Sequence, residues 1–316
     1  SDTYLSSATI VLMTQVLAST DRLGVASGGI MLPNHAPFVV AEQIGTLATL
    51  YPGRVDLGLG RAPGTDRLTA TALRRGASDP GRFAEEILEI LGYLDDGPAQ
   101  EPHVPGSLLL GAPGAPDDAV QGVTADGPRV RAIPGEGTDP AAWILGSSVN
   151  GARVAGTLGL PFAVASHFAP AQAEAAITTY RGHFSDFAAD AGARPLSRDG
   201  KPHVAAGVNA VVAPSRAEAD RLFTTAMAAA ARVVGGRPGP LDAPDDDPRA
   251  WRALAGGRED VVEASMGLSF VGTPDVVAAD IRELASRWGL EEILVVTYVH
   301  DAVARRRSYE LLAAAW

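Results

Sequence analysis

Residues 27–66 alternate between apolar segments and chain-breaking residues in an order that predicts a strand, a helix and a second strand. Residues 23–32 form a short apolar run, and residues 55–59 form another. Between them, Pro37 begins a segment with apolar residues at helical spacing, and proline is favoured in the first turn of a helix. Two strands joined by one helix run parallel, so this segment predicts an α/β fold built on a parallel sheet.

The rest of the chain continues this alternation without a change in composition, which predicts one α/β domain over residues 1–316. Residues 97–138 are rich in glycine and proline, and we expect an insertion over the mouth of the ligand site, with short strands at 108–110 and 130–133. Further strands are expected at 143–145, 160–165, 204–212 and 292–297. Helices are expected at 4–19, 80–94, 149–158, 171–187, 216–233, 258–266, 274–288 and 302–315. The expected helix caps are Asp79, Ser147 or Ser148, Ser215 and Asp301.

Charge and residue types exclude several classes of protein. The formal net charge of −11 argues against general binding to nucleic-acid phosphates. The chain has no cysteine, so disulfides and thiol nucleophiles are excluded. The six histidines show no zinc-type spacing and no Gly-x-Ser-x-Gly motif occurs, so we expect neither a metal site nor a serine hydrolase. With no apolar run of about 18 residues and no signal peptide, we expect a cytoplasmic protein without a membrane segment.

Glycines and polar residues follow both strands of the first segment, at the end of a parallel sheet where ligands bind. Gly28 and Gly29 follow the first strand. Residues 58–64 follow the second, but their spacing is G-x-G-x-x-x-G and no helix begins directly after them, so a Rossmann site is not expected. Arg61 lies where its guanidinium could reach an anion. A surface ion pair is the open alternative for this arginine, and likewise for Arg82 near the start of the next helix.

A second candidate anion site lies where residues 146–151 connect a strand to a helix. Gly146, Ser147 and Ser148 are small, and the N-terminus of a helix offers free N–H donors and partial positive charge. Phosphate binding and plain capping of the helix by a serine both agree with this pattern.

These segments together resemble the bacterial luciferase-like flavin monooxygenases, in particular their antibiotic-biosynthesis branch. The segments that carry the resemblance are SGG-x-MLPNH-x-P, AEQ and PGR-x-DLGLGRAPGTD within 27–66, WILGSS (143–148), GLPFAVASHFAP (159–170), GRPGPL (236–241), VGTP (271–274) and RRRSYELLA (305–313). They cover nearly the whole chain apart from residues 97–130. The resemblance implies a (β/α)8 TIM barrel that binds FMN.

The barrels of this family begin with a strand, a helix and a second strand that ends in a Glu-His-His or similar motif. These elements are missing before the apolar run at 23–32. Either the sequence omits an N-terminal segment or the chain is an open variant of the barrel. A barrel without these strands would expose sheet edges and an apolar interior, so we favour the omission.

The resemblance also assigns roles to individual residues. A non-proline cis peptide that lies beneath the flavin ring in this family maps onto Gly28–Gly29. Together with Gly60, these glycines would leave room for O2 on one face of the ring. His167, directly after the strand at 160–165, would face the ring and is the candidate catalytic residue, with a structural histidine as the alternative. The residues that would hold the flavin phosphate are Arg61, Arg82, Gly146, Ser147 and Ser148.

The implied function is an FMN-dependent monooxygenase that receives reduced FMN from a separate flavin reductase and uses O2 to oxidise a small organic substrate. Light emission is not expected, because Gly60 stands where the luciferases carry a cysteine. Two alternatives stay open: a dehydrogenase that uses the deazaflavin F420 on the same fold, and a flavin-binding protein without catalysis. The resemblance also implies a homodimer.

Overall fold

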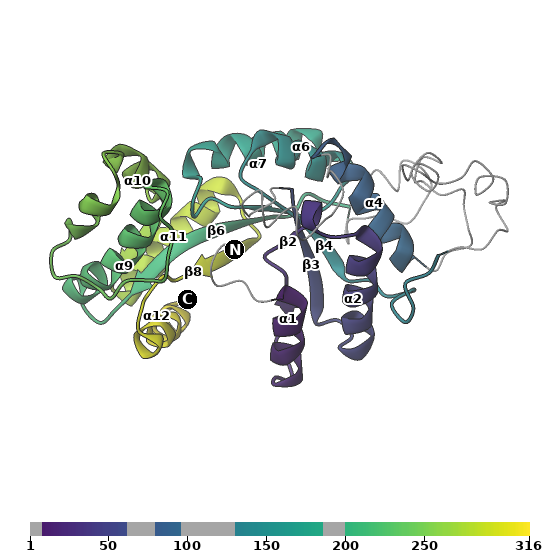
Figure 1. Ribbon diagram of the computed structural model, residues 1–316, viewed down its shortest axis with the longest axis horizontal. Coiled ribbons are helices and arrows are strands. Elements are labelled where there is room, and N and C mark those ends of the chain that lie inside the picture. The colour runs from purple at the N-terminus through teal and green to yellow at the C-terminus, as the bar shows by residue number, and fades with distance from the viewer. Residues whose placement is uncertain (1–7, 62–79, 96–129, 186–199) are drawn as a thin grey trace. The chain divides into compact units, whose positions relative to one another are not determined.

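The computed structural model describes residues 8–61, 80–95, 130–185 and 200–316 (Figure 1). The chain divides into two compact units, and each is described by itself: an N-terminal unit that ends at Trp143 and a C-terminal unit from Ile144 to Trp316. The strand pairs within each unit are parallel. No helix in these ranges combines the length and the apolarity needed to cross a membrane.

The N-terminal unit contains the predicted strand, helix and strand. Its elements are α1 (Thr9–Ala18), β1 (Val25–Ala26), β2 (Ile30–Met31), the 3-10 turn η1 (Leu32–Asn34), α2 (Pro37–Leu50), β3 (Val55–Gly60), the 3-10 turn η2 (Pro80–Arg82) and α4 (Phe83–Leu94). Both β1 and β2 pair with β3, and Met31 lies opposite Gly60. The predicted strand at 23–32 therefore follows one line along β3 but is interrupted at residues 27–29.

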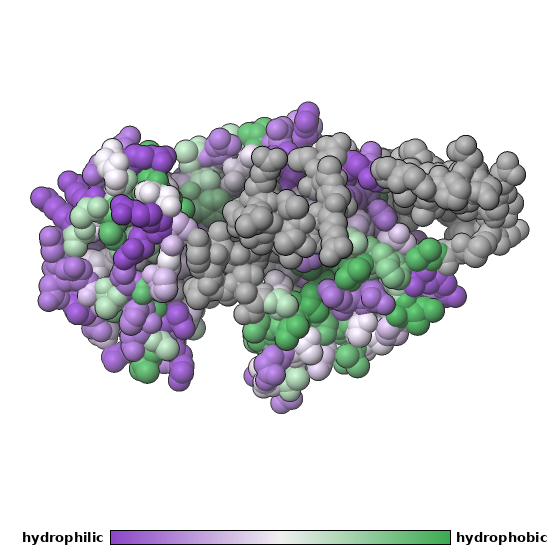
Figure 2. All heavy atoms as spheres, viewed as in Figure 1, coloured by the Kyte–Doolittle hydropathy of each residue, from purple (hydrophilic) through white to green (hydrophobic). Residues whose placement is uncertain are grey.

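Helix α1 is apolar on more than one side. Met13 and Leu17 are buried, whereas Val11 and Leu12 are 66% and 53% exposed. Figure 2 shows apolar residues on the surface of this unit around α1 and α2. Periodicity cannot choose the buried face of such a helix, so its contacts with β1 and α2 decide which side is covered.

The short strand predicted at 130–133 is wrong, because this segment leads into a turn. The turn touches α2: a β-carbon added at Gly45 would lie 2.5 Å from Cα of Gly135. Backbone contact with a helix therefore replaces strand pairing in this segment. The part of the predicted insertion before residue 130, including the strand expected at 108–110, lies outside the described residues.

The C-terminal unit is built around one long buried strand, β6. Its elements are β4 (Ala141–Gly146, which begins in the N-terminal unit), α6 (Val149–Thr157), β5 (Phe162–Val164), the 3-10 turn η4 (Pro170–Gln172), α7 (Ala173–His183), β6 (Val204–Val212), α9 (Arg216–Val234), the 3-10 turn η5 (Ala250–Leu254), α10 (Glu259–Ser265), β7 (Ser269–Gly272), α11 (Pro274–Trp288), β8 (Glu292–Val296) and α12 (Ala302–Ala315). β6 pairs with β5, β7 and β8, and all nine of its residues are buried. Its apolar run with two β-branched ends is typical of a strand covered on both faces.

Several predicted elements are confirmed with their caps. β6, α11 and α12 have the predicted bounds. Ser215 caps α9, because its Oγ accepts the N–H of Glu218 at 3.3 Å. Asp301 caps α12, because its Oδ1 accepts the N–H of Ala304 at 2.8 Å. Capping joins residues three apart in sequence, so it can be predicted from local sequence alone.

Other boundaries differ from the prediction. Helix α4 begins at Phe83, because residues 80–82 form the 3-10 turn η2, and the predicted cap Asp79 lies outside the described residues. Helix α7 is shorter than predicted at both ends, and the turn η4 precedes it. β7 was not predicted from the sequence, because it is a four-residue strand whose pairing with the end of β6 is a long-range contact.

Candidate functional site

A buried serine holds the interruption between β1 and β2. Ser27 is 2% exposed, and its hydroxyl donates to the carbonyl oxygen of Gly58 and accepts the Gly58 N–H, both at 2.8 Å. The side chain thus takes the place of main-chain pairing where the strand is broken. The peptide bond between Gly28 and Gly29 at this break is cis, as the resemblance implied.

Gly28 and Gly60 differ in their surroundings. A β-carbon added at Gly28 would meet nothing within 4 Å, whereas one added at Gly60 would lie 2.9 Å from Sδ of Met31. Gly28 therefore borders open space at the break in the strand. The space beside Gly60 is occupied by the flexible Met31 side chain.

The two predicted phosphate-binding arginines differ in their partners. Arg61 follows β3, is half-buried, and has no hydrogen-bond or ion-pair partner within the described part of the chain. Arg82 precedes α4, and its Nε donates to Oε2 of Glu85 at 3.2 Å; the two side chains are 44% and 45% exposed. Arg82 thus forms the surface ion pair that was the open alternative. Such an exposed pair contributes only about 0–1 kcal/mol, so exchanging Glu85 for a phosphate costs little.

The turn between β4 and α6 has the form of an anion site. Ser148 is the N-cap of α6, and its Oγ accepts the N–H of Gly151 at 3.4 Å, which confirms the predicted cap. Ser147 beside it is half-buried. A β-carbon added at Gly146 would lie 3.4 Å from the ring of Phe162 and 3.7 Å from Cα of Gly151, so Gly146 and Gly151 lie close to one another across the turn. The N-terminus of this nine-residue helix carries partial positive charge, which favours an anion.

His167 lies in the loop after β5 and packs against the backbone of β6. A β-carbon added at Gly207 would collide with Nδ1 of its imidazole. Ser166, directly before it, is buried and donates from Oγ to the carbonyl oxygen of Gly207 at 2.7 Å. Phe168 lies edge-on to the imidazole, with ring centroids 4.8 Å apart. Burial lowers the pKa of His167, so the ring is neutral at pH 7.

Asn209 contacts His167 and was not identified from the sequence. It lies in the middle of β6, is 3% exposed, and donates from Nδ2 to the main-chain carbonyl oxygen of His167. The same Nδ2 lies 3.9 Å from Sδ of Met266. The signal was present in the sequence, because Asn209 is the one polar residue in the run VAAGVNAVV. A polar side chain in a strand buried on both faces calls for an explanation.

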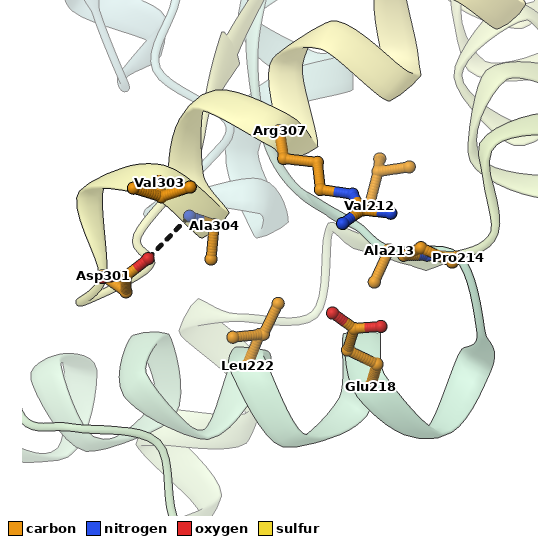
Figure 3. A pocket seen from close by; sticks show the side chains of 9 residues that line it. All are labelled: Val212, Ala213, Pro214, Glu218, Leu222, Asp301, Val303, Ala304 and Arg307. Atoms are coloured by element: carbon orange, nitrogen blue, oxygen red, sulfur yellow. Dashed lines mark hydrogen bonds between the residues drawn. The ribbon is translucent and has the colours of Figure 1, made fainter.

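A separate cavity of about 180 Å³ lies between the starts of α9 and α12. Figure 3 shows Glu218 of α9 and Arg307 of α12 directed toward the space between these helices, with Leu222 beside Glu218 on α9. None of the predicted site residues lines this cavity. Ligand pockets usually measure about 300–1,000 Å³, so this cavity is small for a cofactor or substrate site.

The predicted site residues fall into two groups, one in each unit. Gly28, Gly29, Gly60, Arg61 and Arg82 belong to the N-terminal unit, and Gly146, Ser147, Ser148 and His167 belong to the C-terminal unit. The convergence of the two groups on one cofactor stays a prediction. No group of three or more histidine and acidic side chains in the described ranges is placed to hold a metal ion.

The chain matches known proteins over nearly its whole length. Residues 1–292 match the luciferase-like monooxygenase family. The Bacillus subtilis (strain 168) protein YvbT is 38% identical over 312 residues, which cover 98% of this chain and 82% of YvbT. A luciferase-like monooxygenase of Escherichia coli (strain K12) is 36% identical over 307 residues, which cover 97% of this chain and 80% of that protein.

Solved structures show the same similarity. Apo-MsnO8 is 31% identical, with a TM-score of 0.73 over 98% of this chain and 82% of MsnO8. Two more distant structures share the fold. The oxygenating constituent of 3,6-diketocamphane monooxygenase from Pseudomonas putida, in complex with FMN, has a TM-score of 0.60 at 18% identity. An F420-dependent secondary alcohol dehydrogenase, in complex with an F420-acetone adduct, has a TM-score of 0.63 at 16% identity. Both alignments cover 98% of this chain and 85% of the chain in the solved structure.

The parallel strand order, the family match and the relatives above 30% identity agree with one another. The fold is the α/β TIM-barrel fold of apo-MsnO8 and its structural neighbours. The chain belongs to the luciferase-like monooxygenase family of flavin-dependent oxidoreductases.

Proposed function

We propose that this protein is an FMN-dependent monooxygenase that uses reduced FMN and O2 to oxidise a small organic substrate. The observation that carries the proposal is the β4–α6 turn. There, the carboxyl end of a parallel strand meets a serine-capped helix N-terminus, the arrangement that suits a phosphate group. The motifs of residues 27–66 support a place in the antibiotic-biosynthesis branch of the family.

The residues of the C-terminal unit fit the phosphate and the ring of FMN. Ser147 and Ser148 bring hydroxyl groups and the first N–H groups of α6 to one small turn, which can surround phosphate oxygens. His167 is neutral at pH 7 and its Nδ1 has no partner in the described chain. Because Nδ1 is buried against Gly207, the other ring nitrogen, Nε2, is the atom that could offer a hydrogen bond to the flavin ring or to a substrate.

The residues of the N-terminal unit fit the same cofactor. Arg61 offers a guanidinium without a partner within the described ranges, and Arg82 offers one in a weak exposed pair. Gly28 borders open space that a side chain would reduce. When bound, reduced FMN supplies the electrons for the reaction with O2, while the protein holds the phosphate, orients the ring and limits access of water.

A titration of the purified protein with FMN, followed by visible absorption, tests the proposal. We expect saturable binding that weakens about tenfold or more in Arg61→Ala and in Arg82→Ala, because each loses a charged hydrogen bond. Arg216→Ala is the matched control: Arg216 also forms an exposed pair, with Asp220 of α9, and should leave FMN affinity unchanged.

Absence of saturable FMN binding by the wild-type protein would refute the proposal. F420 is then the next ligand, since a solved structure with this fold holds an F420-acetone adduct. If FMN binds, consumption of O2 with chemically reduced FMN separates a monooxygenase from a flavin-binding protein without catalysis. We propose in addition that a flavin reductase is a transient partner and that the protein is a homodimer. Light scattering on the purified protein tests the homodimer.

A further inference from the structure

Two buried polar side-chain atoms in the described chain have no hydrogen-bond partner, and they belong to neighbouring residues. They are Nδ1 of His167 and Oδ1 of Asn209. Asn209 is 3% exposed and His167 is partly buried. Buried polar atoms are nearly always paired, because an unpaired one loses its bonds to water without replacement. Two unpaired atoms in contacting residues therefore indicate a feature kept for a purpose other than stability.

Hydrogen bonds hold the main chain around His167, whereas Nδ1 of its ring has no hydrogen-bond partner in the described chain. Nδ2 of Asn209 donates to the carbonyl oxygen of His167, and Oγ of Ser166 donates to the carbonyl oxygen of Gly207. These two bonds join the loop after β5 to β6 at Gly207 and at Asn209. The contacts fix where the ring lies without using a ring nitrogen.

Gly207 and Asn209 share one face of β6, because side chains two residues apart in a strand point the same way. The glycine leaves the space in which the imidazole rests, since any side chain at Gly207 would collide with Nδ1. The asparagine supplies the bond that keeps the histidine above that space. The pattern Gly-x-Asn in β6 thus forms a seat for His167, meaning the space above Gly207 together with the hydrogen bond from Asn209.

We propose that Asn209 is a positioning residue for His167, which it holds above Gly207 so that the imidazole can bind an uncharged polar group of a ligand. The proposal rests on the proposed function, in which that ligand is the cofactor ring or the substrate. No protein partner within the described ranges fixes which ring nitrogen carries the proton. A neutral imidazole can therefore meet a hydroxyl or N–H as an acceptor and a carbonyl as a donor.

The position of the ring can be measured without a ligand, because burial lowers the pKa of His167 and no charged group contributes to the shift. In Asn209→Leu the loop loses one of its two hydrogen bonds to β6, the one at His167 itself, and we expect the ring to move toward water. We expect NMR titration of the ligand-free protein to show that the His167 pKa rises by about half a unit or more. Asn209→Thr, a smaller side chain that suits a strand, is the second variant if leucine disturbs the fold.

Thr225→Val is the matched control. Thr225 is also fully buried in the C-terminal unit, and its Oγ1 donates to the main-chain carbonyl oxygen of Asp242 at 3.0 Å. Its loss removes the same kind of bond at a place with no contact to His167. We expect the His167 pKa in this variant to equal that of the wild type.

A double-mutant cycle on FMN affinity tests whether Asn209 acts through His167. We expect Asn209→Leu to weaken binding about fivefold or more in the wild-type background and to have no further effect in His167→Ala. An unchanged His167 pKa in both Asn209 variants, or an equal loss of affinity in both backgrounds, would overturn the proposal. If the wild-type protein binds no FMN, the proposed function fails, and the pKa measurement alone still decides the role of Asn209.

Discussion

The hydroxyl of Ser27 bonds twice to Gly58, donating to its carbonyl oxygen and accepting its N–H at 2.8 Å each. One side chain thus satisfies two buried backbone groups of β3 at the point where β1 ends and before β2 begins. The two glycines that follow Ser27 were predicted to belong to the site, whereas no role was predicted for the serine itself. The pairing between β1 and β3 stops after Ala26, and the two side-chain hydrogen bonds of Ser27 to Gly58 replace main-chain pairing there.

Ser27→Ala should lower the free energy of unfolding by about 1–3 kcal/mol, because it leaves the N–H and the carbonyl oxygen of Gly58 buried without partners. Urea denaturation followed by circular dichroism measures the change. Thr46→Ala serves as the control, since Thr46 donates to Glu42 on the exposed side of α2 and should change stability by less than about 0.5 kcal/mol. Equal losses in the two variants would contradict the role given to Ser27.

Gly45→Ala and Gly92→Ala should change stability in opposite directions. A β-carbon at Gly45 would lie 2.5 Å from Cα of Gly135, and backbone cannot move aside, so overpacking should cost about 1–3 kcal/mol. A β-carbon at Gly92 in α4 would meet nothing within 4 Å, and alanine there should add up to about 1 kcal/mol through helix propensity. Thermal unfolding of both variants checks the prediction, and destabilisation of equal size would contradict it.

Gly207→Ala should displace the imidazole of His167, because the new β-carbon would lie only 2.4 Å from Nδ1. The displaced ring would be more exposed to water, so the pKa of His167 should rise toward its ordinary value. NMR titration measures it. Gly182→Ala is the control, since Gly182 lies in α7 and has open space around its Cα; a shift of the same size in both variants would argue against the seat on β6.

The pKa of His167 also predicts how stability depends on pH. Burial lowers this pKa in the folded state, so the unfolded chain binds the proton more readily. The contribution of His167 is therefore fully present above its ordinary pKa of about 6.5 and is lost as the pH falls from there toward the folded pKa. His167→Gln should flatten the decline in unfolding free energy between pH 7 and pH 5, measured by urea denaturation at each pH. Parallel curves for the two proteins would contradict this prediction.

The elements that were predicted correctly depend on interactions between near neighbours in the chain. The caps of α9 and α12 lie three residues from the N–H groups that they accept, and Pro37 lies at the start of α2. β6 is confirmed because eight apolar or small residues and one asparagine form a strand buried on both faces. The residues that were missed, Ser27 and Asn209, act on partners far away in the sequence.

The parallel α/β architecture, the family and the positions of most helices and strands could be predicted from the amino-acid sequence, because periodicity, breaking residues and caps act over a few residues. Contacts between side chains and distant parts of the chain depend on the tertiary structure. Ser27 meets Gly58 across 31 residues and Asn209 meets His167 across 42, and only strand pairing and the packing of loops on β6 bring these atoms together. The same holds for the burial that lowers the pKa of His167, since desolvation depends on surroundings that no local pattern records.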